Sequence, residues 1–214
     1  MTDAHAIRGK AAALRMDNLD TDQIMPKQFL RGIDKSGLDK GLLYDLRFDA
    51  AGQARPDFML NRPERAGIRI LLGGANFGCG SSREHAVWGL QQYGIQAVIA
   101  PSFGEIFYSN AMNNRLLLVV LPQETVATLM DATDKDAGSL IGIDLTEMTV
   151  SGAGLVTPFS LSERHRRMFL EGLDLIGSSL QYQPQIDAFA AAHWASQPWL
   201  KDVARLTRDR LGQT

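Results

Sequence analysis

Residues 68–85 read IRILLGGANFGCGSSREH, which places a short apolar run, a glycine-rich loop and the start of a helix in direct succession. The apolar run at residues 68–72 is typical of a buried strand, and the glycines after it allow a tight turn. The following segments alternate in the same way: a helix at 83–93, a strand at 97–100, a helix at 103–113 and a strand at 116–121. This alternation predicts an α/β fold whose central sheet contains parallel strands and is flanked by helices.

The two helices after the loop share a start signal. Ser81 stands three residues before Glu84, and Ser102 stands three residues before Glu105. A serine followed three residues later by glutamate is typical of a capping box, in which each side chain accepts a hydrogen bond from the other residue's backbone amide. We therefore expect both serines to cap these helices, and Gly94 to end the first helix in a left-handed conformation.

The rest of the chain predicts smaller elements around this unit. Residues 7–16 are strand-like, residues 17–22 have the composition of a loop, and residues 26–49 indicate short helices interrupted by glycines. Further elements follow: a helix at 124–132, strands at 141–145, 148–151 and 155–159, and helices at 160–170 and 182–199. A length of 214 residues favours one domain, which we place at residues 1–200 and follow with a charged tail at 201–214.

Composition and charge exclude several classes of protein. Hydrophobic residues make up 45% and charged residues 21% of the chain, which is typical of globular domains and argues against disorder. The formal net charge of −2 gives no positive field for nucleic acid or anionic lipid. The longest apolar run, residues 116–121, is far shorter than the roughly 20 residues that span a bilayer. Because the first ten residues also lack the apolar core of a signal peptide, we expect a cytoplasmic protein without nucleic-acid or membrane partners.

Cys79 is the single cysteine of the chain. It cannot form an internal disulfide, and one thiolate cannot hold a structural zinc ion or an iron–sulfur cluster, which need about four ligands. The carboxylates of Asp20 and Asp22 invite a metal hypothesis, but their spacing lacks the further ligands of an EF-hand loop. The sequence therefore predicts that this chain alone binds no metal and no cofactor.

The glycine-rich loop does not match three familiar motifs. A phosphate-binding P-loop needs a lysine after its last glycine, and none is present. A dinucleotide fingerprint needs a third glycine where this chain has Arg83, and a nucleophile elbow needs a glycine two residues after its serine, where Ser82 is followed by Glu84. What remains is a turn of small residues before a helix N-terminus, with two hydroxyls and a guanidinium. Such a turn suits a carboxylate or another small oxyanion.

A purely structural interpretation of the loop is also open. Ser81 could simply cap the helix, the glycines could simply turn the chain, and Arg83 could be solvated. An arginine in the first turn of a helix is nevertheless disfavoured by about 0.3–1 kcal/mol, because the helix dipole repels a cation there. A bound anion would compensate for that cost, so the sequence favours the small-anion site.

Three blocks of sequence carry a family resemblance. They read DTDQIMPKQFL at residues 20–30, GCGSSREHA at 78–86 and IAPSFGEIF at 99–107. In this order they resemble the small subunits of 3-isopropylmalate dehydratase in the aconitase superfamily, and GLDLIG at residues 172–177 is similar to the family's C-terminal region. The resemblance implies that the α/β fold is the swivelling β/β/α domain of that superfamily.

The resemblance also implies an activity and a partner. The family's small subunit acts with a large subunit that carries a [4Fe-4S] cluster on its own cysteines, as a heterodimer or a dimer of heterodimers. The implied reaction is the interconversion of 2-isopropylmalate and 3-isopropylmalate through isopropylmaleate, in leucine biosynthesis. It needs no redox change, and a metal centre would act in it as a Lewis acid.

Individual residues take roles from the same resemblance. Ser81 would be the catalytic base, and Arg83 would bind a substrate carboxylate. Arg31, or else Lys27, would anchor a second carboxylate, because superfamily members place a basic residue shortly after the Asp-Thr-Asp motif. The remaining predicted site residues are two that contact the substrate, Gly80 and Ser82, and four that support the site, Asp20, Thr21, Asp22 and His85.

Two other functions stay open at this stage. A related hydro-lyase could share the fold and mechanism but act on citraconate, 2-methylmalate or a dimethylmalate. A protein of a different class, a non-enzymatic dicarboxylate-binding module, could use the same loop as a sensor. It would bind its ligand tightly without a cluster-bearing partner.

Overall fold

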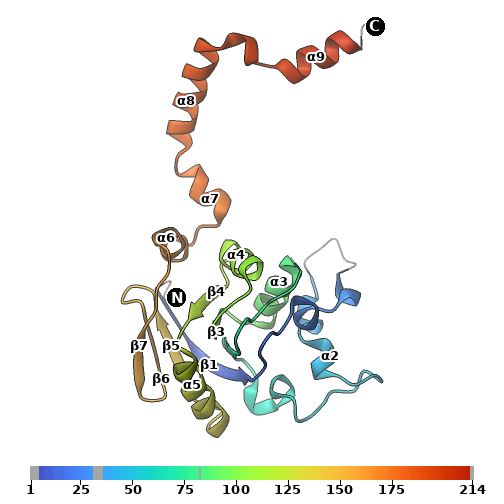
Figure 1. Cartoon of the computed structure of the whole chain (residues 1–214), viewed down its shortest axis with the longest axis vertical. Coiled ribbons are helices and arrows are strands. Elements are labelled where there is room, and N and C mark those ends of the chain that lie inside the picture. The colour runs from blue at the N-terminus through green and yellow to red at the C-terminus, as the bar shows by residue number, and fades with distance from the viewer. Residues whose placement is uncertain (1–4, 31–35, 82, 213–214) are drawn as a thin grey trace. The chain divides into compact units, whose positions relative to one another are not determined.

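The computed structural model describes residues 5–30, 36–81 and 83–212 (Figure 1). The strands are β1 (Ala6–Leu14), β2 (Ile70–Gly73), β3 (Ala97–Ala100), β4 (Leu117–Val120), β5 (Leu140–Asp144), β6 (Thr149–Gly152) and β7 (Leu155–Pro158). The α-helices are α1 (Thr21–Ile24), α2 (Tyr44–Arg47), α3 (Glu84–Tyr93), α4 (Glu105–Asn113), α5 (Gln123–Lys135), α6 (Glu163–Glu171), α7 (Leu175–Leu180), α8 (Gln183–Ser196) and α9 (Val203–Leu211). Short 3₁₀ helices are η1 (Lys27–Phe29), η2 (Leu38–Lys40), η3 (Met59–Asn61), η4 (Pro63–Arg65) and η5 (Pro198–Leu200).

The seven strands follow the order β4-β3-β2-β1-β5-β6-β7. Strands β4, β3, β2 and β1 are parallel, whereas β5, β6 and β7 continue from β1 in antiparallel fashion. The long strand β1 joins the two halves, because residues 6–10 pair with β5 and residues 11–14 pair with β2. The predicted α/β fold with a sheet that contains parallel strands is confirmed.

Helices cover both faces of the parallel strands. On one face Leu71 and Val98 belong to a core that includes side chains of α3 and α4. On the other face Ile70 and Ile99 belong to a second core, into which α5 places Val126, Leu129 and Met130. Figure 1 shows α3 and α4 on the opposite side of the strands from α5. Burial on both faces explains why these strands are continuously apolar in the sequence rather than alternating.

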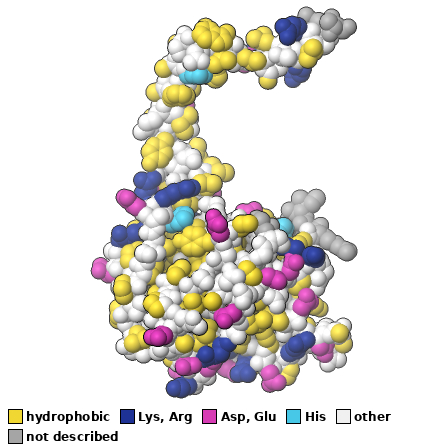
Figure 2. Space-filling model, in the orientation of Figure 1, with side chains coloured by type: hydrophobic (Ala, Val, Ile, Leu, Met, Phe, Trp, Pro, Cys, Tyr) yellow, Lys and Arg dark blue, Asp and Glu magenta, His cyan; other side chains and the backbone are white. Residues whose placement is uncertain are grey.

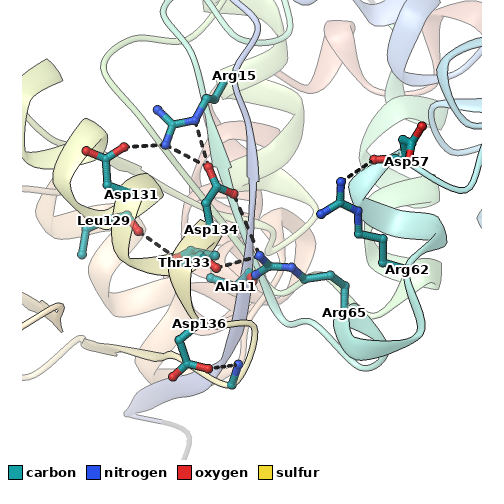
Figure 3. Close-up of polar contacts among 11 residues, drawn as sticks. Ala11, Arg15, Asp57, Arg62, Arg65, Leu129, Asp131, Thr133, Asp134 and Asp136 are labelled. Carbon is teal, nitrogen blue, oxygen red and sulfur yellow. Dashed lines mark hydrogen bonds and ion pairs between the residues drawn. The ribbon is translucent and has the colours of Figure 1, made fainter.

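A buried arginine fastens β1 to α5 from outside the sheet (Figure 3). Arg65 is 5% exposed, and its guanidinium donates hydrogen bonds to the backbone carbonyls of Ala11 at 3.2 Å and Thr133 at 2.6 Å. Its Nη2 also lies 3.9 Å from Asp134, whose other carboxylate oxygen accepts from Arg15. Arg65 therefore ties η4, the central strand and a flanking helix together, which is a structural role.

The helix boundaries agree with the sequence, but the predicted caps were wrong. The N-cap positions of α3 and α4 are Arg83 and Gly104, and neither has a side-chain capping hydrogen bond. Ser102 instead uses its hydroxyl to accept a hydrogen bond from the backbone amide of Asn76, at 2.8 Å. Gly94 ends α3 with φ +105°, as predicted. A long-range contact between loops thus replaces the local cap that the sequence indicated.

The chain divides into two compact units, residues 1–174 and residues 175–214. The division falls earlier than the domain boundary that the sequence indicated after residue 200. Its physical cause is burial, since Met168 is the last buried side chain among the residues that the structure describes. The second unit contains α7, α8, η5 and α9, so most of the segment that the sequence indicated as a tail is helical.

Candidate active site

Three loops meet at the carboxyl ends of the parallel strands. The described part of the loop after β2, residues 74–81 and 83, lies between the loop after β1 and the loop after β3. Isolated parallel bridges join Asp20 to Cys79 on one side and Phe77 to Phe103 on the other. Open α/β sheets bind ligands beyond the carboxyl ends of their strands, so this edge is the expected place for a site.

Phe77 fixes the central loop to the core. Its side chain is fully buried, and its ring centroid lies 6.1 Å from that of Phe103 and 5.6 Å from that of Phe107. The next residue must be glycine, because Gly78 has φ +74° and a Cβ there would collide with the ring of Phe107. A Cβ on Gly104 would lie 2.6 Å from the carbonyl oxygen of Gly78. These glycines therefore serve the close approach of the loops.

Helix α1 holds the same loop from the other side. Asp20 begins α1 with a complete capping box, in which its carboxylate accepts from the amide of Gln23 at 2.7 Å. Thr21 is buried, its amide donates to the carbonyl of Cys79 at 2.9 Å, and its hydroxyl donates to the carbonyl of Ser81 at 2.8 Å. The backbone of Ser81 is thus attached to a capped helix that lies 60 residues away in the sequence.

Arg83 forms an ion pair with Asp22. The arginine side chain is 14% exposed and the aspartate side chain is 43% exposed. From the sequence we expected Arg83 in the first turn of a helix, where a bound anion would compensate for its charge. That prediction was wrong in part, because Arg83 is the extended N-cap residue of α3 and the chain itself supplies a compensating carboxylate.

Ser81 is exposed at the surface of the loop, three residues before the first residue of α3. Gly80 is also exposed and has φ +91°, a conformation that strains any residue with a side chain. Lys27 is exposed on η1. Two predicted site residues, Arg31 and Ser82, lie outside the described residues. The structure therefore brings Gly80, Ser81 and Arg83 together with Asp20, Thr21 and Asp22.

His85 lies in the first turn of α3 and packs against the ring of Trp88, with 4.8 Å between the ring centroids. The indole of Trp88 donates to the side-chain oxygen of Asn114 at 3.0 Å, and the amide group of Asn114 donates to Glu84 at 2.9 Å. Sequence reasoning missed Asn114 because it is distant in the chain and belongs to no motif. It joins the end of α4 to the first turn of α3, immediately after Arg83.

Two asparagines were also missed by sequence reasoning. Asn76 takes φ +56°, and its side chain donates to the side chain of Asn18 at 2.9 Å. Asparagine adopts a positive φ more readily than most residues. An asparagine within a glycine-rich loop is therefore the sequence signal that could have identified Asn76. Together with the bond from the amide of Ala75 to Asp17, at 2.7 Å, this contact fastens the start of the loop to the loop after β1.

Cys79 does not form part of a metal centre among the described residues. Its thiol donates to the backbone carbonyl of Asn18 at 3.3 Å. No group of three or more histidine, cysteine, aspartate or glutamate side chains that could hold a metal ion occurs in residues 5–30, 36–81 and 83–212. The residues described here do not fit an iron–sulfur cluster, which needs several thiolates.

Two shifted pKa values belong to a pair of rings beside α4. Burial raises the pKa of Tyr108, whereas burial and then the nearby charge of Arg164 lower the pKa of His165. The two rings lie 6.0 Å apart, and Tyr108 also contacts Phe103. This pair joins α6 to α4. In the part of the chain that the structure describes, every helix is too short or too polar to cross a membrane.

Comparison with known proteins gives the class of the chain. The aconitase C-terminal domain family matches residues 1–124, the part that contains the four parallel strands and all three loops of the site. A solved structure of a 3-isopropylmalate dehydratase from Methanocaldococcus jannaschii has a TM-score of 0.61 and 30% identity, over 86% of this chain and 98% of that chain. The chain therefore has the fold of an aconitase C-terminal domain.

Sequence relatives give the particular family. A small subunit 1 of 3-isopropylmalate dehydratase from Chromobacterium violaceum is 64% identical over 211 residues, which are 99% of this chain and all of that protein. A small subunit 2 from Salmonella typhimurium is 45% identical over 92% of this chain and 95% of that protein. The chain belongs to the family of 3-isopropylmalate dehydratase small subunits, and the resemblance read from the sequence is confirmed.

Proposed function

We propose that this chain is the small subunit of a cytoplasmic hydro-lyase that interconverts 2-isopropylmalate and 3-isopropylmalate through isopropylmaleate, in leucine biosynthesis. It acts as a heterodimer or dimer of heterodimers with a large subunit. The observation that carries the proposal is the loop cluster at the carboxyl ends of the parallel strands. There the exposed Ser81 stands beside Arg83, and Asp22 orients Arg83 by an ion pair.

Arg83 binds one carboxylate of the substrate. A guanidinium carries five N–H donors in a rigid fork that matches a carboxylate. Asp22 engages Nη1, so the other donors of the fork are available to a ligand as far as the described residues show. Asp22 keeps Arg83 in one orientation, and Arg31 supplies the second carboxylate anchor. Gly80 and Ser82 contact the bound substrate, because a loop without bulky side chains lets its backbone amides approach.

Ser81 exchanges a proton with the substrate. In the dehydration its oxygen takes the proton from the carbon beside the carbinol carbon, and the hydroxyl, which receives a second proton from an acid group outside this chain, leaves as water to give isopropylmaleate. In the rehydration water returns that second proton to the acid group as its oxygen adds to the other carbon, and Ser81 returns its own proton to the carbon that carries the isopropyl group. The nearby N-terminus of α3 and Arg83 favour the deprotonated oxygen, and exclusion of water by the partner strengthens both effects.

The supporting residues keep the base in place. Thr21 holds the carbonyl of Ser81, Asp20 caps the helix that carries Thr21, and His85 packs against Trp88 behind Arg83. We place the [4Fe-4S] cluster on the large subunit, because the one cysteine of this chain cannot bind it. There it supplies a Lewis acid for the hydroxyl group. Besides the hydroxyl group and the carboxylate that Arg83 binds, the proposed substrate carries an isopropyl group and a second carboxylate.

The test is anaerobic turnover by a cluster-loaded large subunit, measured with and without this chain. We expect conversion of 2-isopropylmalate only when both subunits are present, and loss of conversion with Ser81→Ala. Citraconate and 2-methylmalate are included as alternative substrates, and preference for either would move the activity to a related hydro-lyase. No stimulation with any substrate, from a partner with an intact cluster, would overturn the proposal in favour of a dicarboxylate-binding module.

A further inference from the structure

The C-terminal unit, residues 175–214, exposes large hydrophobic side chains out of proportion to its length. Seventeen large hydrophobic residues are exposed in the described chain, and twelve of them follow Asp174. They include Ile176, Phe189 and Trp199, each of which is 69–70% exposed. Figure 2 shows hydrophobic side chains along the helices of this unit. The much longer first unit contributes only five exposed residues of this kind among those described.

This unit has no core of its own. None of its described residues, 175–212, is buried. A segment of about 40 residues cannot bury enough surface to be stable without help, and isolated helices of fewer than about 12–15 residues are marginal in water. The 14-residue α8 and the 9-residue α9 therefore depend on packing against another surface. Apolar surface of this extent marks a place where another molecule binds.

The large hydrophobic side chains of helix α8 lie on one side of it, together with His193, which stacks on Phe189, while the opposite side is rich in alanine. Ile186, Phe189 and Trp194 lie at positions i, i+3 and i+8, which share one side of a helix. Ala190 falls on the same side, whereas Ala188 lies on the opposite side. Asp187 is the single aspartate, glutamate, lysine or arginine among the 14 residues of α8. A nearly uncharged helix with an aromatic and aliphatic face fits an apolar groove rather than a charged surface.

We propose that the large subunit covers this face and holds the C-terminal unit in an apolar groove. This inference rests on the proposed pairing with a large subunit. A chain of this family has a larger partner and must keep a surface for it, and exposed large hydrophobic side chains are concentrated here. The four aromatic side chains among them, which are 38–70% exposed, correspond to roughly 450 Å² when each is given about 200 Å², and eight aliphatic side chains add to this area. A standard interface buries about 800 Å² per partner.

The charge of α9 adds to the description of the partner surface. This helix carries three arginines and one aspartate, which gives it a formal charge of +2. Arg205 pairs with Asp202 at 3.3 Å, while Arg208 and Arg210 lie in the last turn. Because the charged rim of an interface fixes orientation, the groove is expected to be apolar opposite α8 and acidic opposite α9.

The experiment uses the full-length chain and the purified large subunit, with binding measured by biolayer interferometry in the absence of substrate. Phe189→Glu places a charge in the apolar face of α8, and Ala188→Glu places the same charge on the opposite side of the same helix. We expect Phe189→Glu to weaken assembly by roughly 30-fold or more, which is typical of losing a central aromatic anchor. Ala188→Glu should change the affinity by less than about threefold.

Each other outcome separates this inference from the proposed function. If the wild-type chain does not bind the large subunit, the pairing itself fails. If the wild type binds and Phe189→Glu binds equally well, only the docking surface is refuted. A lower melting temperature of the isolated Phe189→Glu chain would show that the face packs on its own protein. A dimeric wild-type chain that Phe189→Glu dissociates, with unchanged affinity for the large subunit, would assign the face to a second copy.

Discussion

Arg65 and Arg83, two largely buried arginines of the first unit, make different kinds of contact. Arg65 donates to two backbone carbonyls, of Ala11 and Thr133, and is 5% exposed. Arg83 forms an ion pair with the carboxylate of Asp22, and 14% of its side chain is exposed. The first arginine directs its donors at elements of the fold, whereas the second is oriented by one acid at a loop edge. The contrast agrees with a structural role for Arg65 and with the ligand-binding role that we propose for Arg83.

The surroundings of the two arginines support the same division. Arg65 lies between strand β1 and the flanking helix α5 and donates to one backbone carbonyl of each. Arg83 follows Ser81 in a loop that two glycines and Phe77 fix against neighbouring loops. Burying a polar group costs free energy unless it is hydrogen-bonded, so the N–H donors of a buried structural arginine must find acceptors within the protein. A ligand-binding arginine can keep donors for the ligand.

Ser81→Ala is the change with the largest expected effect. It removes the proposed base, and general base catalysis typically contributes about 10²–10⁴-fold, so kcat should fall by that factor. The hydroxyl is exposed and only the backbone carbonyl of Ser81 holds Thr21, so the melting temperature should stay unchanged. Steady-state kinetics of the assembled enzyme and thermal unfolding of the isolated chain check the two parts. Normal turnover by the variant would remove Ser81 from the mechanism.

Arg65→Leu should act on stability alone. The change takes charged donors away from the carbonyls of Ala11 and Thr133, and we expect a loss of roughly 2–3 kcal/mol in the free energy of unfolding. Urea denaturation of the isolated chain measures it. The kcat of the folded, assembled variant should match the wild type. A variant of unchanged stability but reduced kcat would contradict the contrast between the two arginines.

Asp22→Asn should act mainly on substrate binding. Loss of the charge frees Arg83 from its fixed orientation, and we expect KM to rise by about tenfold with a smaller change in kcat. Since the Asp22 side chain is 43% exposed, the stability of the isolated chain should change by less than about 1 kcal/mol. Kinetics over a range of 2-isopropylmalate concentrations give the readout, and Asp22→Glu tests whether a carboxylate restores the wild-type KM.

Arg15→Ala provides a matched surface control for Arg65. The hydrogen bonds that Arg15 donates to the carboxylates of Asp131 and Asp134 raise its pKa, yet its side chain is 48% exposed. Exposed ion pairs contribute about 0–1 kcal/mol to stability. We therefore expect the free energy of unfolding, measured by urea denaturation, to fall by less than about 1 kcal/mol, and kcat to stay unchanged. A larger loss would mean that Asp134 needs Arg15 in order to support Arg65 (Figure 3).

His165→Gln should have the smallest effect, and it should depend on pH. The folded pKa of His165 lies below its usual value because of burial and Arg164. The unfolded chain then binds more protons than the folded chain as the pH falls below about 6.5, so acidification destabilises the fold. The melting temperature of the wild type should therefore fall more between pH 7 and pH 5 than that of the variant. Equal losses would show that His165 does not contribute.

The order of strands and helices from residue 68 to residue 121 could be predicted from the sequence. Apolar periodicity, Gly94 and the glycine-rich loop are local signals, and each predicted element is present. The helix caps could not be predicted in the same way. Ser102 has the local sequence pattern of an N-cap, but its hydroxyl accepts a hydrogen bond from the backbone amide of Asn76, 26 residues away. A local pattern fails where a partner from elsewhere in the chain competes for the same group.

The candidate site shows the same limit. The loop residues Gly80, Ser81 and Arg83 were identified from the sequence, and the resemblance added Asp22. Neither indicated that Asp22 would pair with Arg83, nor that Asn114 would contact the first turn of α3. Arg65 carried no signal either, because most arginines are exposed and its acceptors are backbone carbonyls. Such acceptors are equivalent in sequence and become distinct only when strands and helices are assembled.

The sequence by itself determined the α/β alternation, the glycine-rich loop and the family, because these depend on residue types and spacings along the chain. The tertiary structure decided which charges pair and where the buried part of the chain ends. It also decided that Ser102 contacts a neighbouring loop instead of capping a helix. The physical reason is distance. Periodicity and turn preference act between neighbouring residues, whereas the ion pair of Asp22 with Arg83 exists only because parallel strands bring their following loops to one edge.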